Sequence, residues 1–352
     1  MRTVLLDKVA SVTANVKLRK DVRVSNEFPC QAGDVVAVRI KNQKSTYSTL
    51  ELTTGRMSSL KPGDVIAGAL GHRNALQGYT GVVPTELKVG DTINVLNMGG
   101  VLGMCTSYSP LVGPPFECEV LGQVLDFPYL ASRVGVPANI ARELPALDSE
   151  TQAQGIPVVA VIGTCMNAGK TEACMTLIQQ LTRQGKRVAA AKATGVSLRR
   201  DVLGMEDAGA FKTLVFTDLG VVTTCAQTGA GLARTLINRL AEEKPDIIVL
   251  ELGDGLLGEY GVDAILADAG IRSAFTATML AAGDPVAAWG GVQLMRERYG
   301  LTPSVITGPA TDNAAGTQLI QNLLGVPGIN ARQSGPELAA CIQAALGTAH
   351  AK

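Results

Sequence analysis

The chain is poor in the residues that build several common kinds of functional site. Its 352 residues include two histidines, one tryptophan and only 4% aromatic residues. Few aromatic side chains argue against a surface for single-stranded nucleic acid, because such surfaces stack the bases on aromatic rings. Acidic and basic residues are equal in number, 31 of each, so no net charge attracts nucleic acid or an anionic membrane. We therefore expect neither as a partner.

The cysteines and the apolar runs exclude further classes of protein. The seven cysteines include no Cys-x-x-Cys pair, and histidines to complete a metal site are few. Neither a zinc site nor a disulfide framework is indicated, so we interpret the cysteines as reduced, small apolar residues. No apolar run reaches the length of a membrane span, and the N-terminus lacks a signal-peptide core. We expect a cytoplasmic location.

The clearest positive feature is a strand, a glycine-bounded turn and a helix start between Val158 and Thr171. The apolar residues 158–162 are typical of a buried strand, and Gly169-Lys170-Thr171 open a helix. Such a turn directs backbone N–H groups and a helix N-terminus at one point, where polyphosphate can bind. One face of the predicted helix is apolar and contains Ala173, Leu177, Ile178 and Leu181.

The turn is one residue longer than the usual phosphate-binding pattern when it is counted from Gly163. The pattern has four residues before Gly-Lys-Thr and would begin at Thr164. An ordinary glycine-rich turn is the alternative interpretation. We predict that Lys170 neutralises the outer phosphates and that the Thr171 hydroxyl binds Mg²⁺. The expected nucleotide contacts are Gly163, Thr164, Cys165, Met166, Asn167, Ala168, Gly169, Lys170 and Thr171.

The longer turn is similar to that of one group of nucleotide-binding proteins. Residues 163–171 resemble the Gly-Thr-x-x-x-x-Gly-Lys-Thr loop of dethiobiotin synthetase and related amide-forming ATPases. The resemblance covers about residues 156–330, and only the loop is specific by itself. Three later segments follow in the family's order: Lys192-Ala-Thr-Gly195, with Ala193 where proline is usual, Glu206-Asp207-Ala208, and Glu251-Leu-Gly-Asp-Gly255 after an apolar strand.

The resemblance implies roles for residues in these segments. Asp207 and Glu251 would be the acidic ligands of Mg²⁺ beside Thr171, and Lys192 would act with Lys170 in catalysis. A carboxylate at the end of a buried strand next to the loop also suits Mg²⁺ on physical grounds. The alternatives are a solvated strand end for Glu251 and Lys192, and a helix cap for Asp207.

Asp312 and Asn313 follow a late predicted strand, where the resemblance places contacts with the nucleotide base. Either residue would equally suit the cap of the following helix. The Asn-Lys-x-Asp box of guanine-specific switch proteins is absent from the sequence. We expect ATP and Mg²⁺ as cofactors and leave the choice between ATP and GTP open.

The first 148 residues have a different pattern. Gly-Asp precedes a strand-like apolar run three times, at Gly33, Gly63 and Gly90. This spacing is consistent with hairpins of a small β-barrel, in which Gly-Asp forms the turn before each strand. A helical pattern follows around residues 129–147, and the polar residues 149–155 are typical of a linker.

Residues 156–352 alternate between strand and helix patterns. The alternation predicts an α/β fold, a mostly parallel P-loop NTPase sheet with helices on both faces, preceded by the small β-barrel-like domain. Ligands of such sheets bind at the carboxyl ends of the strands, where the candidate site residues lie. Strands are expected near 157–162, 187–191, 213–216, 246–252, 274–281 and 303–307, and helices at 229–243, 285–299 and 312–324.

The leading functional hypothesis is an Mg²⁺-dependent, ATP-using enzyme of ligase, cyclo-ligase or kinase type. It would activate a small carboxylate or carbamate by phosphoryl transfer, with Lys192 and the run Arg199-Arg200-Asp201 facing this acidic substrate. The alternative is a nucleotide-hydrolysing switch or chaperone whose barrel domain binds a protein partner. By analogy with dethiobiotin-synthetase-like enzymes we expect a homodimer.

Overall fold

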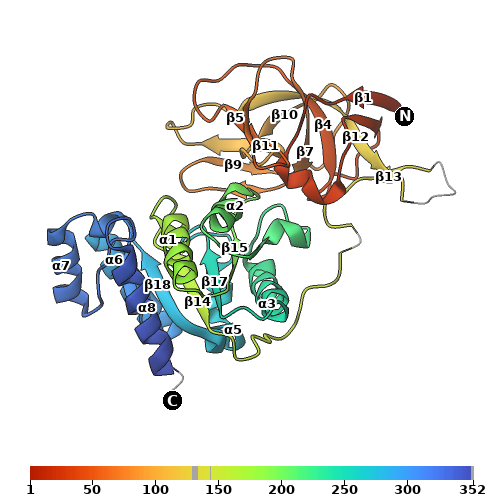
Figure 1. The fold of residues 1–352 in the computed structure, drawn as a ribbon. Helices are drawn as coiled ribbons and strands as arrows, with labels where there is room; N and C mark the ends of the chain where they lie inside the picture. Colours follow the sequence, from red (N-terminus) through yellow and green to blue (C-terminus); the bar gives the residue numbers. More distant parts are fainter. Residues whose placement is uncertain (129–133, 143, 350–352) are drawn as a thin grey trace. The chain divides into compact units, whose positions relative to one another are not determined.

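The computed structural model describes residues 1–128, 134–142 and 144–349 (Figure 1). The chain divides into two compact units. Unit 1 consists of residues 1–145, 196–200 and 216–223, and unit 2 of residues 146–195, 201–215 and 224–352. The sequence predicts a single division at 149–155, whereas the structure adds two later segments to unit 1. In the described part of the chain, no helix combines the length and apolar character needed to cross a membrane.

The segment expected as a linker is anchored to unit 2. The backbone N–H of Asp148 donates to Thr235 Oγ1 at 2.7 Å, and that of Gln152 donates to Asn238 Oδ1 at 2.6 Å. The Asn238 amide in turn donates to Asp148 Oδ2 at 2.8 Å. Both partner side chains lie on helix α3 (Ala226–Glu242), so this helix fixes the path of the chain into unit 2.

Unit 1 contains a sheet that closes into a barrel. In the described residues, strand pairings lead from β12 through β4, β7, β11 and β10 back to β12. A closed ring of this kind is the small barrel that the Gly-Asp pattern predicts. The elements are β1 (Arg2–Leu5), β2 (Lys8–Val9), η1 (Ser11–Val16), β3 (Asp21–Ser25), β4 (Val35–Ile40), β5 (Thr49–Glu51), β6 (Met57–Ser59), β7 (Val65–Leu70), β8 (Arg73–Asn74), β9 (Tyr79–Val82), β10 (Thr92–Val95), β11 (Val101–Tyr108), β12 (Phe116–Asp126) and β13 (Val136–Pro137).

The three Gly-Asp turns have the same hydrogen bonds. Each glycine has a φ between 91° and 95°, a left-handed conformation that suits a residue without a Cβ atom. Each aspartate Oδ2 accepts from the backbone N–H three residues earlier, at 2.7 or 2.8 Å, and so stabilises the turn. Strands β4, β7 and β10 begin directly after Gly33-Asp34, Gly63-Asp64 and Gly90-Asp91.

The helix predicted around residues 129–147 is wrong in the part that the structure describes. Strand β13 pairs antiparallel with β12 there, and Ala138 N–H donates to Val124 O at 2.8 Å. The edge of β12 offers hydrogen-bond partners, and Pro137 is unfavourable inside a helix, so extended backbone is preferred to a weak helical periodicity. Residues 129–133 and 143 lie outside the described residues.

Unit 2 is built on a six-stranded sheet in the described residues, with the order β16-β15-β17-β14-β18-β19. Every pairing in it is parallel, as predicted. From residue 158 onward the elements are β14 (Val158–Gly163), α1 (Lys170–Arg183), β15 (Val188–Thr194), α2 (Arg200–Asp207), β16 (Lys212–Val215), η2 (Phe216–Leu219), α3 (Ala226–Glu242), β17 (Ile247–Leu252), α4 (Val262–Ala267), α5 (Ala269–Ala274), β18 (Phe275–Ala281), α6 (Pro285–Tyr299), β19 (Val305–Thr307), η3 (Pro309–Thr311), α7 (Ala314–Leu324) and α8 (Gly335–Ala349).

Helices cover the sheet of unit 2 and place its strand ends at one edge. All residues of β14 and β17 are buried, which requires cover on both faces. Helices α1 and α8 pack together against the sheet, and α3, α4 and α5 form a second group. The predicted apolar face of α1 is confirmed, since Ala173, Leu177, Ile178 and Leu181 are buried. The parallel strands end at the same edge of the sheet, where the phosphate loop begins.

Candidate functional site

The turn between β14 and α1 has the geometry of a phosphate-binding loop. Asn167 and Gly169 have φ values of 58° and 95°, so the chain turns tightly before α1 begins at Lys170. The start of the loop is anchored to β18, because Thr164 N–H donates to Ala281 O at 2.9 Å. The first N–H groups of α1 have no carbonyl partner within the helix and are available to phosphate oxygens.

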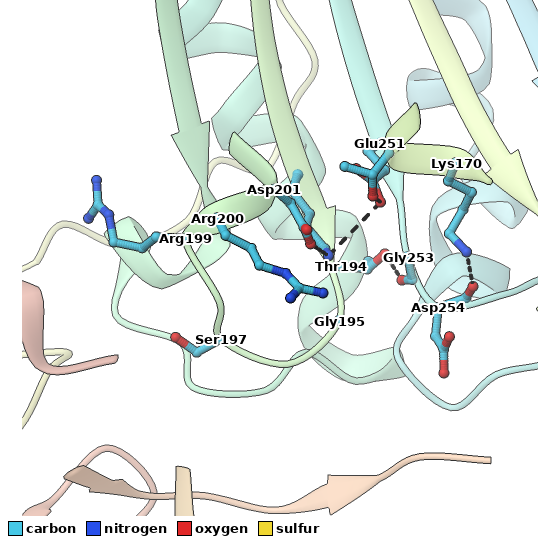
Figure 2. Close-up of polar contacts among 12 residues, drawn as sticks. Lys170, Thr194, Gly195, Ser197, Arg199, Arg200, Asp201, Glu251, Gly253 and Asp254 are labelled. Carbon is cyan, nitrogen blue, oxygen red and sulfur yellow. Dashed lines mark hydrogen bonds and ion pairs between the residues drawn. The ribbon is translucent and has the colours of Figure 1, made fainter. Parts of the chain in front are cut away.

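The Lys170 side chain folds back over this loop. Only 7% of the residue is exposed, and its Nζ donates to the backbone carbonyl oxygens of Cys165, at 2.8 Å, and of Asp254 (Figure 2). Burial lowers the pKa of Lys170, and the charges of Glu251 and Asp254 offset this only in part. An enclosed ammonium that rests on carbonyl oxygens favours a ligand anion, because phosphate oxygens carry more negative charge than carbonyls.

The Thr171 hydroxyl and the Glu251 carboxylate lie beside the loop and are suited to bind Mg²⁺. Thr171 Oγ1 donates to Glu251 Oε1 at 3.0 Å, and Glu251 Oε2 is buried without a hydrogen-bond partner among the described residues. Neighbouring ligands of an octahedral Mg²⁺, each about 2.1 Å from the ion, lie about 3 Å apart. Burial raises the pKa of Glu251, while the charge of Lys192 opposes the rise. The described residues form no group of three or more His, Cys, Asp or Glu side chains suited to a metal, so phosphate and water would complete the shell.

Lys192 is enclosed rather than solvated. The register of the sheet places it opposite Glu251, and its side chain is 12% exposed. Its Nζ contacts Asp201 Oδ2 and lies 3.9 Å from Glu251 Oε1. Burial alone would lower the pKa of Lys192, but the carboxylates of Asp201 and Glu251 outweigh burial and raise it. Lys192 therefore stays charged, with two acidic partners.

The structure does not bring Asp207 to this cluster. Asp207 is exposed at the C-terminal end of α2, whereas Asp201, in the first turn of the helix, contacts Lys192. Six helical residues separate the two by about 9 Å along the axis. The expected set of Thr171, Asp207 and Glu251 is thus reduced to Thr171 and Glu251. Asp201, which sequence reasoning treated only as part of a basic run, is the second acid beside Lys192.

A pocket adjoins the phosphate loop and is also lined by the segments that precede and follow α7. Asp312, one of the two predicted base contacts, lies on it. Asn313 has the alternative role, since its side chain accepts from Gly316 N–H at 3.0 Å and caps α7. Sequence reasoning missed three lining residues in the segment after α7, because a short irregular stretch carries no motif. The lining consists of Asn167, Gly169, Glu172, Gly308, Pro309, Asp312, Asn330, Ala331 and Arg332.

Within unit 1, a buried carboxylate holds the segment that contains Arg199 and Arg200. Glu51 is fully buried, and its two oxygens accept from the backbone N–H groups of these residues at 2.7 and 2.8 Å. The Arg199 side chain lies 3.3 Å from Asp218 Oδ1. Arg199, expected to face an acidic substrate, therefore has an acidic partner in its own unit. Glu51 had no signal in the sequence, since a single acid at the end of a short strand forms no pattern.

Solved structures with a similar fold have low sequence identity to this chain. The signal recognition particle receptor FtsY of Elizabethkingia anophelis, in complex with GDP, is 15% identical, and the match covers 57% of this chain and 68% of that one with a TM-score of 0.40. The signal recognition particle 54 kDa protein of Aeropyrum pernix, in complex with GDP, is 15% identical over 60% and 52%, with a TM-score of 0.37. A DUF1611 family protein of Anabaena variabilis is 18% identical over 58% and 63%, with a TM-score of 0.37. No family profile and no curated protein matches the sequence.

The geometry of unit 2 defines a P-loop NTPase fold. Its evidence is the parallel sheet, the loop between β14 and α1, and Lys170 and Thr171 at the start of the helix. TM-scores of 0.40 or less add nothing to this about substrates or partners. The narrower resemblance to dethiobiotin synthetase is not reflected in these three similar structures. The function must therefore be inferred from the residues of the site itself.

Proposed function

We propose that the chain is an Mg²⁺-dependent P-loop nucleoside triphosphatase that works as a nucleotide-driven switch, with unit 1 as the module that responds to the nucleotide. Lys170 would neutralise the phosphoryl oxygens, and Thr171 and Glu251 would hold Mg²⁺ directly or through water. Mg²⁺ would supply further charge neutralisation on the phosphates. Phosphoryl transfer to water needs these parts and little covalent chemistry from the protein.

The observation that carries the switch is the path of the chain after β15 and β16. Residues 196–200 and 216–223 follow the carboxyl ends of these strands, and both segments belong to unit 1. Unit 1 holds the first segment by Glu51 and by Asn97, whose amide donates to Ser197 O at 3.1 Å. Loops that follow the strands near the phosphates are the parts that reorganise in nucleotide switches.

Nucleotide binding would change the partners of Lys192. In the structure, Glu251 accepts from Thr171 and lies beside Lys192. Once Thr171 and Glu251 engage Mg²⁺, less of the Glu251 charge is available to Lys192, which would then rely on Asp201. Asp201 directly follows Arg200 in the chain, so a shift of Asp201 reaches the segment held by Glu51 through one peptide bond.

Hydrogen exchange tests the switch. The amides of residues 196–200, including the two that donate to Glu51, should exchange at different rates with a non-hydrolysable triphosphate and with the diphosphate, each with Mg²⁺. Amides of β4 inside the barrel are the control and should exchange alike in both states. Basal hydrolysis should be slow. Identical exchange at 196–200 with both nucleotides bound would rule out the switch while leaving nucleotide binding intact.

The enzyme hypothesis is the second candidate, and one observation favours it. Lys192 is enclosed and charged, as a lysine that holds an acidic substrate should be. Asp201 and Glu251 already match this charge, however, which leaves little attraction for a further carboxylate. An ATP-dependent ligase or kinase would turn over little nucleotide alone and respond strongly to one small acid. Screening small carboxylates for stimulated nucleotide turnover separates the two functions. A strong response to one carboxylate would contradict the switch hypothesis and support the enzyme hypothesis.

A further inference from the structure

We infer that the pocket beside the phosphate loop selects guanine over adenine, and that the carboxylate of Asp312 makes this choice. The inference rests on the proposed function, since it concerns the base of the same triphosphate. It goes beyond that function by naming the nucleotide class. Its grounds are the position of the pocket, the fixed orientation of Asp312 and the different hydrogen-bonding edges of the two purines.

A close approach of two backbones places the pocket directly beside the loop. Gly308 has a φ of 90°, and a Cβ atom there would lie 2.2 Å from Ala168 O. A Cβ atom on Gly169 would lie 3.3 Å from Gly308 Cα. The two segments can therefore approach this closely only because residue 308 is a glycine. A nucleotide with its phosphates at the loop would have an open pocket next to it for the base.

Asp312 lines this pocket, and a hydrogen bond from Asn330 orients its carboxylate. Asn330 is 8% exposed and donates from Nδ2 to Asp312 Oδ1 at 2.9 Å. Its Oδ1 accepts from the backbone N–H groups of Arg332 and Gln333 at 2.9 and 3.1 Å, so the amide cannot flip without losing these bonds. Asp312 Oδ2 accepts no hydrogen bond from the part of the chain that the structure describes. Asn330 thus uses one lone pair of Oδ1, and the second lone pair of Oδ1 and both lone pairs of Oδ2 are left for a ligand.

A carboxylate distinguishes the two purines by their donors. Guanine presents two adjacent donors, N1–H and the N2 amine, which match the two oxygens of one carboxylate. Adenine presents its N6 amine beside the N1 lone pair, which a carboxylate oxygen repels. At the rim of the pocket, Arg332 Nε lies 3.8 Å from Glu172 Oε2 and adds a cationic donor of the kind that guanine O6 accepts. The polar groups of the pocket therefore complement guanine.

Calorimetry on the full chain with Mg²⁺ and non-hydrolysable analogues of GTP, ATP and XTP tests the inference. The wild type should bind the GTP analogue about tenfold or more tightly than the ATP analogue, the size expected for one bidentate base contact. Asp312→Asn should lose this preference and gain affinity for the XTP analogue, because an amide accepts from N1–H and donates to the C2 carbonyl of xanthine. Glu297→Gln changes an exposed carboxylate on α6 outside the pocket and should bind as the wild type does.

The outcomes separate this inference from the proposed function. Equal wild-type affinity for the GTP and ATP analogues, or an Asp312→Asn variant without gained xanthine affinity, overturns the guanine assignment and leaves the triphosphatase standing. No association of the wild type with any of the three overturns the triphosphatase itself. If Asp312→Asn fails to fold, the ratio of GTP to ATP affinity in the wild type decides the inference alone.

Discussion

The candidate site contains two enclosed lysines, one in the phosphate loop and one at the end of β15, and their surroundings differ. Lys170 contacts backbone carbonyls, including that of Asp254, and burial lowers its pKa. Lys192 contacts the Asp201 carboxylate and lies near Glu251, and these charges raise its pKa despite burial. The two regions therefore bury the same type of residue with opposite electrostatic results.

This difference indicates that Lys170, and not Lys192, is the lysine suited to bind an anionic ligand. Carbonyl oxygens carry partial charges, so the ammonium of Lys170 has more to gain from a bound phosphate than from its present partners. The charge of Lys192 is already neutralised by Asp201 and Glu251. Removing it would leave the two enclosed carboxylates to repel each other. We expect substitution of Lys170 to affect turnover and substitution of Lys192 to affect stability.

The largest expected effect is the loss of hydrolysis in Lys170→Ala. Removing one preorganised charge from the phosphoryl group should lower the rate of nucleotide hydrolysis by roughly a hundredfold to a thousandfold or more. Phosphate release measures it, with thermal unfolding as the check on folding. Lys186→Ala, which changes an exposed lysine after α1, is the matched control and should retain full activity. Unaltered turnover in Lys170→Ala would refute the assignment of the phosphate site.

The next effect is on stability. Lys192→Met should lower the free energy of unfolding by about 3–5 kcal/mol, because Asp201 and Glu251 are then buried without their cation. Lys170→Met should cost less, since carbonyls tolerate the loss of a donor better than carboxylates tolerate the loss of a counter-charge. Urea denaturation of the two variants side by side measures the difference. A larger loss in Lys170→Met than in Lys192→Met would reverse the comparison.

A smaller expected effect on stability distinguishes Asp201, which the structure places beside Lys192, from Asp207, which the resemblance predicted as a metal ligand. Asp201→Asn removes a charge-assisted contact with Lys192 and should cost about 1–3 kcal/mol of unfolding free energy. Asp207→Asn changes an exposed side chain and should stay within about 0.5 kcal/mol. The concentration of Mg²⁺ needed for half-maximal hydrolysis should be unchanged in Asp207→Asn. An increased Mg²⁺ requirement there would restore Asp207 as a metal ligand.

The contrast between Asp201 and Asp207 also shows how far the sequence predicts the site. The phosphate loop is contiguous, so residues 163–171 reveal both its local geometry and its chemistry. Lys192 and Glu251 stand out in the sequence because both end buried strands, and parallel strands bring such ends together. Asp201 could not be found in this way. Its contact with Lys192 depends on where α2 begins, and the boundaries of elements are the least certain part of a sequence-based prediction.

In the fold, too, features set by local sequence patterns are predicted, whereas features set by contacts between distant residues are not. The three Gly-Asp turns and the alternation of strands and helices use only local patterns, and both are present in the structure. The assignment of residues 196–200 to unit 1 depends on Glu51, which is about 150 residues away in the chain and binds backbone N–H groups that any residue possesses. A contact made to backbone leaves no trace in side-chain patterns, which is why the sequence does not predict that residues 196–200 belong to unit 1.

The smallest expected effect is a pH dependence that distinguishes the two lysines. Burial lowers the pKa of Lys170 from its ordinary value of 10.5, so Lys170 loses its proton first as the pH rises. Its charged form is the active one, and kcat/KM for hydrolysis, which reports the free protein, should therefore fall at a pH below 10.5. Lys192, whose pKa is raised, stays charged across this range. Lys170→Arg keeps its charge at every accessible pH, so residual hydrolysis in that variant should lack the alkaline fall. An unchanged fall in Lys170→Arg would mean that another group titrates there, and the two lysines would no longer differ in the way their surroundings require.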